Sequence, residues 1–347
     1  MSKIILISCV SKKLNLKSKA KDIYVSSLFK KSLEYAELQN PDKIFILSAK
    51  YGLLKLNKKI EPYNQTLNLM TNYEKKSWSE LVLKQLKKET NIKKDKFIFL
   101  AWDSYRKFII PSLNDIEIPM EGLIIWEQLK FLSNNINCLL LHKYFNKLDI
   151  INIPFNKENI PSNWIYILFE KWEKYYWYNR IVRVWTHTWD NNLYNRIKEH
   201  FITENKDRSI FRKNIGRAIL NKKEDSFLDL WNIDLTTRLN KDKYSWKIDR
   251  DYLKKIEKKV SKYMNKNFYF IVFEVDTKEK RLDFEEKIIS TISNSYNFKG
   301  SEKWLGNYSP IEKIKNNWLW LIQGLNKTPL NIKETDEIIQ KLNNWQN

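Results

Sequence analysis

Short apolar runs alternate with stretches of helical periodicity over residues 1–145. The runs have the length of buried strands, and the stretches between them repeat apolar residues at the three- and four-residue spacing of an amphipathic helix. Strands that alternate with helices form a mostly parallel sheet covered by those helices. The sequence thus predicts an α/β domain with strands at Ile4–Ser8, Ile44–Leu47 and Phe97–Leu100, and with helices at Ser26–Leu38, Tyr73–Lys88 and Leu123–Leu132.

The second half has another order, two strands followed by helices, a strand and a last helix, which predicts a small α+β sheet domain. Residues 143–162 between the halves are polar and contain Pro154 and Pro161, as is typical of a linker. We therefore expect domains at 1–147 and 161–347, joined by a linker at 148–160. The strands expected in the second half are Ile165–Phe169, Arg180–Val184 and Phe268–Phe273, and the helices are Asn192–Phe201, Ile210–Leu220, Asp249–Met264 and Leu282–Ile292.

Charge and composition narrow the classes of partner. The formal net charge is +21, which attracts polyanions and favours a nucleic acid, most simply DNA, although an AT-rich genome would also enrich lysine. No run of 18 apolar residues is present, so no membrane partner is expected. Cys9 and Cys138 make no metal-binding pattern and suit a reduced, cytoplasmic compartment. Nothing in the composition indicates an oligomeric state.

The chain has too few glycines for compact α/β domains, which need them in tight turns. It has 6 glycines and 14 tryptophans, where a share of about 7% would give roughly 24 glycines. We hypothesise that eight tryptophans are UGA codons that the organism reads as glycine; a protein with true aromatic platforms for bases is the alternative. UGG codons at these positions would end the hypothesis. The eight are Trp102, Trp126, Trp164, Trp172, Trp177, Trp185, Trp189 and Trp318, whereas Trp78, Trp231, Trp304 and Trp320 stand in apolar settings.

An ordered set of motifs appears in the second half if positions 164 and 185 are glycine. Gly-Ile165-Tyr166 then opens the first strand, and the second strand ends in glycine after Val184. A Thr-His-Thr turn containing His187 follows, then Leu193, Arg196 and His200 on a helix, and Glu285 on a later helix. This order resembles the GIY-YIG nuclease family over residues 161–325. The resemblance implies a Mg²⁺-dependent endonuclease with Tyr166, Arg196 and Glu285 as the functional positions.

The residue types suit phosphodiester hydrolysis. Glu285 could hold one Mg²⁺, which binds through one or two carboxylates together with substrate phosphate. The fork of Arg196 matches phosphate oxygens, and Tyr166 could orient or deprotonate water. His187 and His200 are alternative acid–base groups, because histidine titrates near neutrality. Each of these residues could instead be a packing residue or a solvated surface residue.

One position departs from the family pattern. Arg183 stands where the family has its second-strand tyrosine, so either His187 supplies the base or the domain binds DNA without cutting it. A genuine tryptophan at 185 would crowd the site and weaken activity. A non-catalytic DNA-binding protein is therefore the alternative to an endonuclease.

Two further segments of the second half carry expectations. Arg212, Lys213 and Arg217 have the spacing of a phosphate-binding stripe on a helix, although a plain solvated face is equally compatible. The segments Lys303–Pro310 and Leu319–Trp320 resemble the closing motif of a branch of this family that has a longer insert. We expect Trp304 and Trp320 to serve mainly in packing.

The first half has its own series of motifs, including LSAKYGLL at Leu47–Leu54 and Glu61-Pro-Tyr63. The series resembles an uncharacterised bacterial and phage domain family, distantly similar to the peroxide-stress protein YaaA, over residues 1–145. The motifs lie at the carboxyl ends of strands, where open α/β sheets bind ligands, so we expect a pocket for a nucleotide or flipped base. Its expected residues are Ser8, Cys9, Lys12, Tyr24, Ser48, Lys50, Tyr51, Gly52, Tyr63 and Tyr105.

Together these patterns predict a two-domain DNA-processing enzyme of restriction, repair or phage defence. In the alternative readings the second domain binds DNA without cutting it, or the first domain is a glycosylase-like enzyme that the second anchors to DNA. Polar loop caps around a buried Cys9 would explain the first-half motifs without any ligand.

Overall fold

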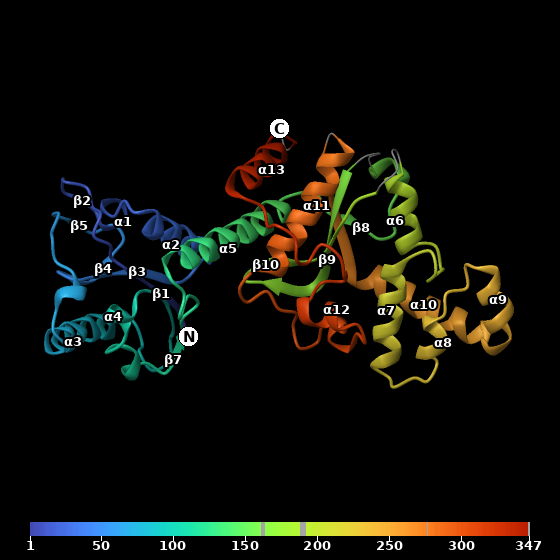
Figure 1. Ribbon diagram of the computed structural model, residues 1–347, viewed down its shortest axis with the longest axis horizontal. Coiled ribbons are helices and arrows are strands. Elements are labelled where there is room, and N and C mark those ends of the chain that lie inside the picture. The colour runs from blue at the N-terminus through green and yellow to red at the C-terminus, as the bar shows by residue number, and fades with distance from the viewer. Residues whose placement is uncertain (161–163, 188–191, 276, 346–347) are drawn as a thin grey trace. The chain divides into compact units, whose positions relative to one another are not determined.

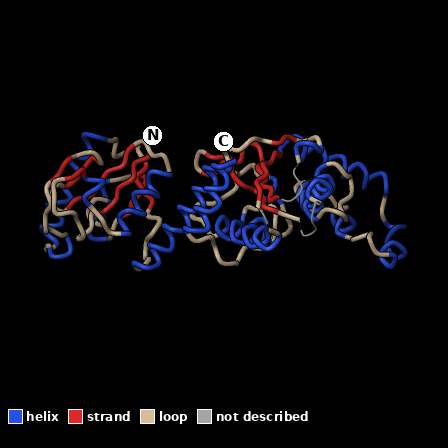
Figure 2. Tube along the Cα trace, turned by 90° about the horizontal axis from the view of Figure 1, so that it is seen from above, coloured by secondary structure: helices blue, strands red, loops and turns tan. Residues whose placement is uncertain are grey.

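The computed structural model describes residues 1–160, 164–187, 192–275 and 277–345. The chain divides into two compact units, Met1–Leu139 (unit 1) and Leu140–Asn347 (unit 2). The division falls inside the long helix α5 (Ile125–Phe145), not in the segment predicted as a linker. In each unit the strands gather in the middle, with helices around them (Figure 1, Figure 2). None of the helices in the described ranges has the length and hydrophobicity needed to span a lipid bilayer.

Unit 1 contains the predicted mostly parallel sheet, with strand order β4-β3-β1-β6-β7. The central strand β1 (Lys3–Ser8) is parallel to β3 (Lys43–Ser48) and to β6 (Lys96–Leu100). The sheet is completed by the parallel edge strand β7 (Asp115–Glu117) and the antiparallel edge strand β4 (Gly52–Lys55). The predicted strands are therefore confirmed, whereas the edge strands and a separate ribbon, β2 (Ser18–Lys19) with β5 (Lys59–Ile60), were not predicted.

Local signals explain the helices of unit 1. Helix α3 (Asn72–Glu89) begins at a capping box in which Thr71 and Glu74 satisfy each other's backbone N–H groups. Its Trp78 indole N–H donates to the Ser48 carbonyl at 2.9 Å, which fastens α3 to the carboxyl end of β3. The other helices are α1 (Ala20–Ile23), α2 (Ser27–Leu38), α4 (Asp103–Arg106) and the start of α5.

Unit 2 is built on an antiparallel sheet with strand order β10-β9-β11-β8. Its strands are β8 (Ile151–Asn152), β9 (Trp164–Tyr175), β10 (Tyr178–Trp185) and β11 (Phe268–Glu274). The interpretation of residues 148–160 as a linker is wrong, because β8 pairs with β11 and Phe155 is buried in the core of unit 2. Polar residues and Pro154 hid this edge strand, which has only two residues.

Helices cover the sheet of unit 2, and one face of the sheet packs against α6, α7 and α10. The four predicted helices are present as α6 (Leu193–Phe201), α7 (Ile210–Asn221), α10 (Arg250–Asn267) and α11 (Lys278–Ser293). The sequence did not predict α8 (Leu228–Asn232), α9 (Arg238–Tyr244), α12 (Glu312–Asn317) or α13 (Ile332–Trp345).

A bulge in β9 directs the carboxylates of Glu170 and Glu173 into the protein, where both are buried. The register passes from Lys174 opposite Asn179 to Phe169 opposite Ile181, so β9 has extra residues there. Within this bulge, Glu170 accepts the indole N–H groups of Trp304 at 2.8 Å and Trp320 at 2.9 Å. The two tryptophans of the predicted closing motif are thus buried, and one carboxylate binds both of them.

The tryptophans fall into two structural groups. Trp78, Trp231, Trp304 and Trp320, predicted to be ordinary, are all buried, and each donates its indole N–H to a protein oxygen. Among the eight predicted as recoded glycines, Trp172 has φ +74° in the β9 bulge with 87% of its surface exposed, and Trp318 has φ +52°. Both lie in the left-handed region that favours glycine. Trp189 lies outside the described residues.

Candidate active site

The sheet of unit 2 places several predicted residues on one face. Tyr166 of β9 lies directly opposite Trp185 of β10, and Arg183 lies opposite Leu168, two residues further along β9. Paired residues on adjacent strands point to the same side of the sheet, so these side chains share the face that packs on α6. Helix α6 contributes His200, whose ring centroid lies 6.5 Å from that of Tyr166.

Tyr166 is fully buried at the centre of this group. Burial raises the pKa of its phenol, and Arg183 and Arg196 act against that rise, whereas Glu285 adds to it. The phenol is therefore within electrostatic reach of both guanidinium groups and of the carboxylate. Arg183, Arg196 and Glu285 therefore all contribute to the electrostatic environment of Tyr166, although the four residues span 120 residues of sequence.

The two arginines differ in what holds them. Arg183 is buried, donates to the Trp320 carbonyl and stacks with its guanidinium carbon 5.0 Å from the Phe211 ring centre. Arg196 is partly exposed, pairs with Glu199 and lies 5.2 Å from the ring centre of Trp185. Arg183 is thus a fixed charge inside the site, and Arg196 is a charge at its edge that can meet an anion from solvent.

Glu285 is a half-buried carboxyl on α11. Burial raises its pKa to about 7, opposed by the charge of Arg183 and by the backbone N–H of Thr186, which donates to the carboxylate. Thr186 also donates its hydroxyl to the Trp164 carbonyl at 3.0 Å, which connects Glu285 to the start of β9. Because these two groups offset only part of the cost of burying the Glu285 charge, a bound cation would stabilise the ionised carboxylate.

The two histidines predicted as acid–base groups, His187 and His200, are both buried, at 1% exposure each. Burial first, and then Arg183, Arg196 and Arg212, lower the pKa of His200 well below its usual 6.5, so this ring is neutral at physiological pH. Its Nδ1 lies 2.7 Å from Ser209 Oγ, which also caps α7. His200 is therefore poorly suited to act as a general acid, and its observed contacts are those of a positioning residue.

Trp185 stands over the candidate site. Its indole lies 5.6 Å from the Tyr166 ring, 5.3 Å from the His200 ring and 5.2 Å from the Arg196 guanidinium, measured between centres. The side chain therefore occupies the space between the buried phenol and the edge arginine. Glycine at this position would leave that space open.

The predicted phosphate stripe on α7 is wrong for two of its three members. Arg212 has no exposed surface, and its Nη2 forms a 2.7 Å ion pair with Glu257 of α10. Lys213 is 8% exposed and pairs with Asp207 at 3.5 Å. Arg217 is partly exposed and donates to Asn232 at 2.6 Å. Glu257, Asp207 and Asn232 lie outside α7, so helical spacing could not reveal them.

In unit 1, five of the ten expected pocket residues come together at the carboxyl ends of β1 and β3. The Tyr63 hydroxyl lies 2.7 Å from Ser48 Oγ and 2.8 Å from the Tyr24 hydroxyl, and Cys9 Sγ lies 3.2 Å from the Tyr105 hydroxyl. Burial raises the pKa of Tyr63, and Cys9 adds to the rise, so the two groups of contacts adjoin.

The other five residues have different positions. Tyr51 packs edge-on against the Tyr63 ring. Gly52, the first residue of β4, has φ +71°, and a Cβ at this position would strike Gln85. Ser8 lines a separate small hollow with Trp102 and Gln128, which is a correction to its predicted place. Lys12 and Lys50 are exposed.

Sequence reasoning missed Lys13. Its ammonium lies 4.3 Å from the centre of the Tyr63 ring and 5.7 Å from that of Tyr24, and burial lowers its pKa. A half-buried cation beside two phenols and near the Cys9 thiol makes this cluster more polar than its sequence suggested. In the sequence, Lys13 was marked only by its position next to Lys12, which was a predicted member of the pocket.

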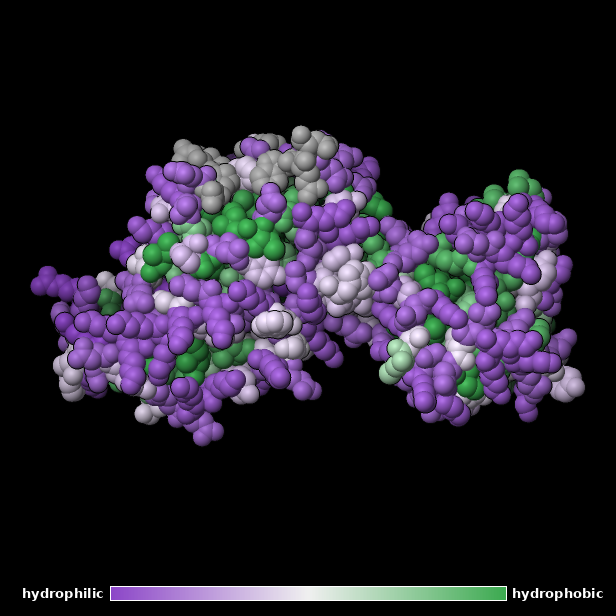
Figure 3. All heavy atoms as spheres, turned by 180° about the vertical axis from the view of Figure 1, so that it is seen from behind, coloured by the Kyte–Doolittle hydropathy of each residue, from purple (hydrophilic) through white to green (hydrophobic). Residues whose placement is uncertain are grey.

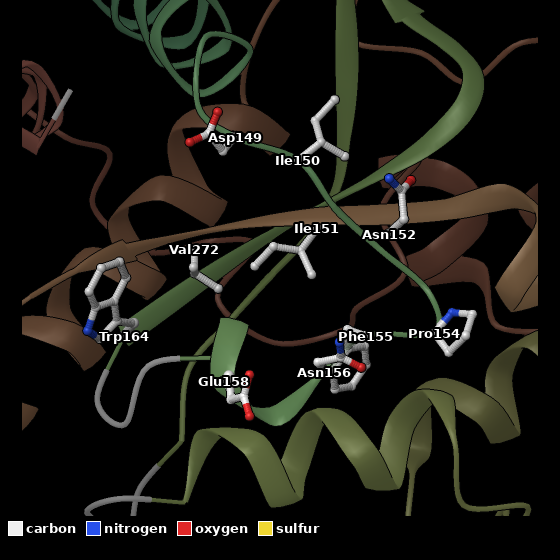
Figure 4. Close-up of a pocket in the computed structure, with 10 residues that line it drawn as sticks. All are labelled: Asp149, Ile150, Ile151, Asn152, Pro154, Phe155, Asn156, Glu158, Trp164 and Val272. Carbon is white, nitrogen blue, oxygen red and sulfur yellow. The ribbon is translucent and has the colours of Figure 1, made fainter.

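A pocket also opens beside the start of β9 in unit 2 (Figure 4). Val272 in its wall is the cross-strand partner of Tyr166, so the pocket adjoins the candidate site without including its predicted catalytic residues. The charged groups that line it are carboxylates, which would repel a phosphate. Its lining includes Asp149, Ile151, Asn152, Phe155, Glu158 and Trp164.

The donor set at Glu285 fits a Mg²⁺ ion that is shared with a substrate. Across the described ranges, no group of three or more His, Cys, Asp or Glu side chains is arranged to hold a metal. Mg²⁺ commonly keeps several waters and binds through one or two carboxylates plus substrate phosphate, for which a single Glu285 suffices. A site that held the ion by protein ligands alone would need more donors.

Comparisons with known proteins separate the same two parts of the chain. A family model described as a GIY-YIG domain matches residues 146–343. A model for a family of unknown function (DUF6884) matches residues 4–134. No curated protein and no solved structure matches the chain.

Proposed function

Because this chain belongs to the GIY-YIG family, we propose that unit 2 is an endonuclease that hydrolyses phosphodiester bonds in DNA. The observation that carries the proposal is that Tyr166 and Arg196 both contact Trp185, with Arg183 on the same face of the sheet. The charges of Arg183, Arg196 and Glu285 all act on the buried phenol of Tyr166. Hydrolysis of a phosphodiester builds negative charge on the phosphate oxygens. Preorganised guanidinium groups stabilise such charge in a site shielded from water.

Each residue has a distinct proposed role. Arg196, at the edge, binds the scissile phosphate through its planar fork, and the buried Arg183 stabilises the charge that develops on it. Tyr166 orients the attacking water through its hydroxyl group, which stays protonated because burial raises the phenol pKa against the opposing charge of Arg183. His200 holds the start of α7 through Ser209.

We propose that Glu285 holds one Mg²⁺ together with the substrate phosphate. The ion would act as a Lewis acid that polarises the phosphate and stabilises the leaving oxygen. The half-buried carboxylate, with its pKa raised to about 7, supports this role because a cation would relieve the cost of its charge.

A plasmid-nicking assay tests the proposal. The wild type should nick supercoiled DNA with Mg²⁺, Glu285→Ala should abolish nicking while DNA binding persists, and Glu286→Ala is the matched control. Glu286 is the exposed neighbour on the same helix and pairs with Lys327 at the surface. Nicking by Glu285→Ala at the wild-type rate would end the proposal.

A DNA-binding protein without nuclease activity is the second candidate. The specific observation in its favour is Trp185, whose indole fills the space between Tyr166 and Arg196. Arg183 in place of a second tyrosine points the same way. Binding to DNA with no nicking by either the wild type or Trp185→Gly would favour this candidate.

For unit 1, we propose recognition of a nucleotide or a base, either an ordinary base or a modified one. The cluster of Cys9, Tyr24, Ser48, Tyr63 and Lys13 supports this, because it lies at the carboxyl ends of strands, where open α/β sheets bind ligands. Tyr63→Phe should weaken binding of a free nucleotide in calorimetry without altering the fold. Release of a base without strand breaks would instead indicate a glycosylase-like activity in this unit.

A further inference from the structure

Residues 238–267 of unit 2 concentrate the positive charge of the chain. This segment, which we name the basic arm, comprises α9, the turn Ser245–Lys247 and α10. It holds eleven basic and four acidic residues, so its net charge of +7 is one third of the +21 of the whole chain in under a tenth of its length. Figure 1 shows α9 and α10 at one end of unit 2, and in Figure 3 this end, at the left of the view, is mostly hydrophilic.

A row of lysines runs along the outer side of α10. Lys254, Lys258, Lys262 and Lys266 recur every four residues and are all exposed. The row spans about 18 Å at the rise of an α-helix. Like charges at this spacing repel each other and weaken a helix, and within the described residues none of the four forms an ion pair that would offset the repulsion.

The inner side of α10 is fixed to the core that surrounds the candidate site. Ile256, Val260 and Met264 are buried there. Between them, Glu257 forms an ion pair with the buried guanidinium group of Arg212. This group also donates a hydrogen bond to the Ser261 hydroxyl at 2.9 Å. The lysine row is therefore carried by a helix that is packed on the same core as Tyr166.

The far end of the basic arm exposes large apolar side chains among its charges. Leu239 and Trp246 are each 76% exposed. Lys247 places its ammonium 4.9 Å from the centre of the Trp246 indole. Apolar and aromatic side chains beside cations are what proteins use to stack on bases or to enter a base step.

We propose that the basic arm binds the duplex DNA that flanks the cleavage point, with the lysine row on one phosphate strand and Trp246 against a base step. Phosphates of one strand repeat at about 3.4 Å along the duplex axis, so the row faces about five of them. This inference rests on the proposed function for its substrate, but DNA binding by the arm can be measured without cutting.

The test uses the full chain with Glu285→Ala, so that no cleavage occurs, and a labelled 30-base-pair duplex in fluorescence anisotropy. The first variant carries Lys254→Gln, Lys258→Gln, Lys262→Gln and Lys266→Gln. The control removes the same charge from exposed lysines of unit 1, with Lys84→Gln, Lys87→Gln, Lys88→Gln and Lys94→Gln.

The arm variant should bind at least about tenfold more weakly, and the slope of log K against log salt should shrink by about 3 to 4, while the control changes little. Trp246→Ala should weaken binding with an unchanged slope, because stacking releases no counterions. Three results would overturn the proposal. The arm variant and the control could lose the same affinity, the slope of the arm variant could stay unchanged, or the protein could bind the same sequence more tightly as duplex RNA. If the wild type binds through the arm but nicks nothing, the arm stands and the proposed hydrolysis fails.

Discussion

Replacing Glu285 with glutamine should make the folded protein more stable at alkaline pH while it removes the proposed metal ligand. The pKa of Glu285 is raised from 4.5 to about 7, chiefly by burial. Between these two pH values the folded state holds a proton that the unfolded state has released. The free energy of unfolding therefore falls as pH rises through this window.

The size of the effect follows from the two pKa values. A rise from 4.5 to about 7 corresponds to at most about 3 kcal/mol of stability lost by pH 8. Glutamine is close in shape, stays neutral and can still accept the Thr186 N–H, so Glu285→Gln avoids this loss. Near pH 4.5, where the wild-type carboxyl is protonated in the folded state, the two proteins should be about equally stable.

Urea unfolding at pH 5 and pH 8 in EDTA measures the difference, and Glu286→Gln is the control at an exposed position. Mg²⁺ should stabilise the wild type at pH 8 and leave Glu285→Gln unchanged. A Glu285→Gln protein that is less stable than wild type at pH 8, or a difference that does not grow with pH, would refute the reasoning about this carboxylate.

Three further substitutions test other contacts. Trp172→Gly should raise stability in urea by about 1 kcal/mol, because an exposed side chain at φ +74° strains the backbone; a loss of stability would contradict this. Trp185→Gly should speed single-turnover nicking at least tenfold by opening Tyr166, and an unchanged rate would show that the indole is no obstacle. Arg212→Met should cost about 3 to 5 kcal/mol in unfolding experiments, because Glu257 is left buried without a partner; a cost below about 1 kcal/mol would disagree with the buried pair.

Much of the fold was predictable because periodicity is a local property. The central strands β1, β3 and β6 are apolar except at their ends, and α3 carries its own capping box and buried stripe. Strand β8 escaped prediction because two residues beside a proline have no period to detect. It joins the sheet only because Tyr269 and Phe270 of β11 lie beside it.

The candidate site was predictable in part. Tyr166, Arg196 and Glu285 were singled out from the order of motifs, and their roles remain predictions. Lys13 could not be foreseen, since its place over the Tyr63 ring depends on the return of the chain 50 residues later. The contact of the half-buried Trp185 with His200 likewise needed the packing of α6 on the sheet.

The sequence alone determined the order of strands and helices and the chemical groups available at their ends. Only the tertiary structure decided which charges meet water. Arg212 is buried because Glu257, 45 residues away, neutralises it, whereas Lys254 on the same helix as Glu257 faces solvent. The physical reason is that a charge can leave water only where a partner compensates its desolvation, and that partner arrives through folding rather than through local spacing.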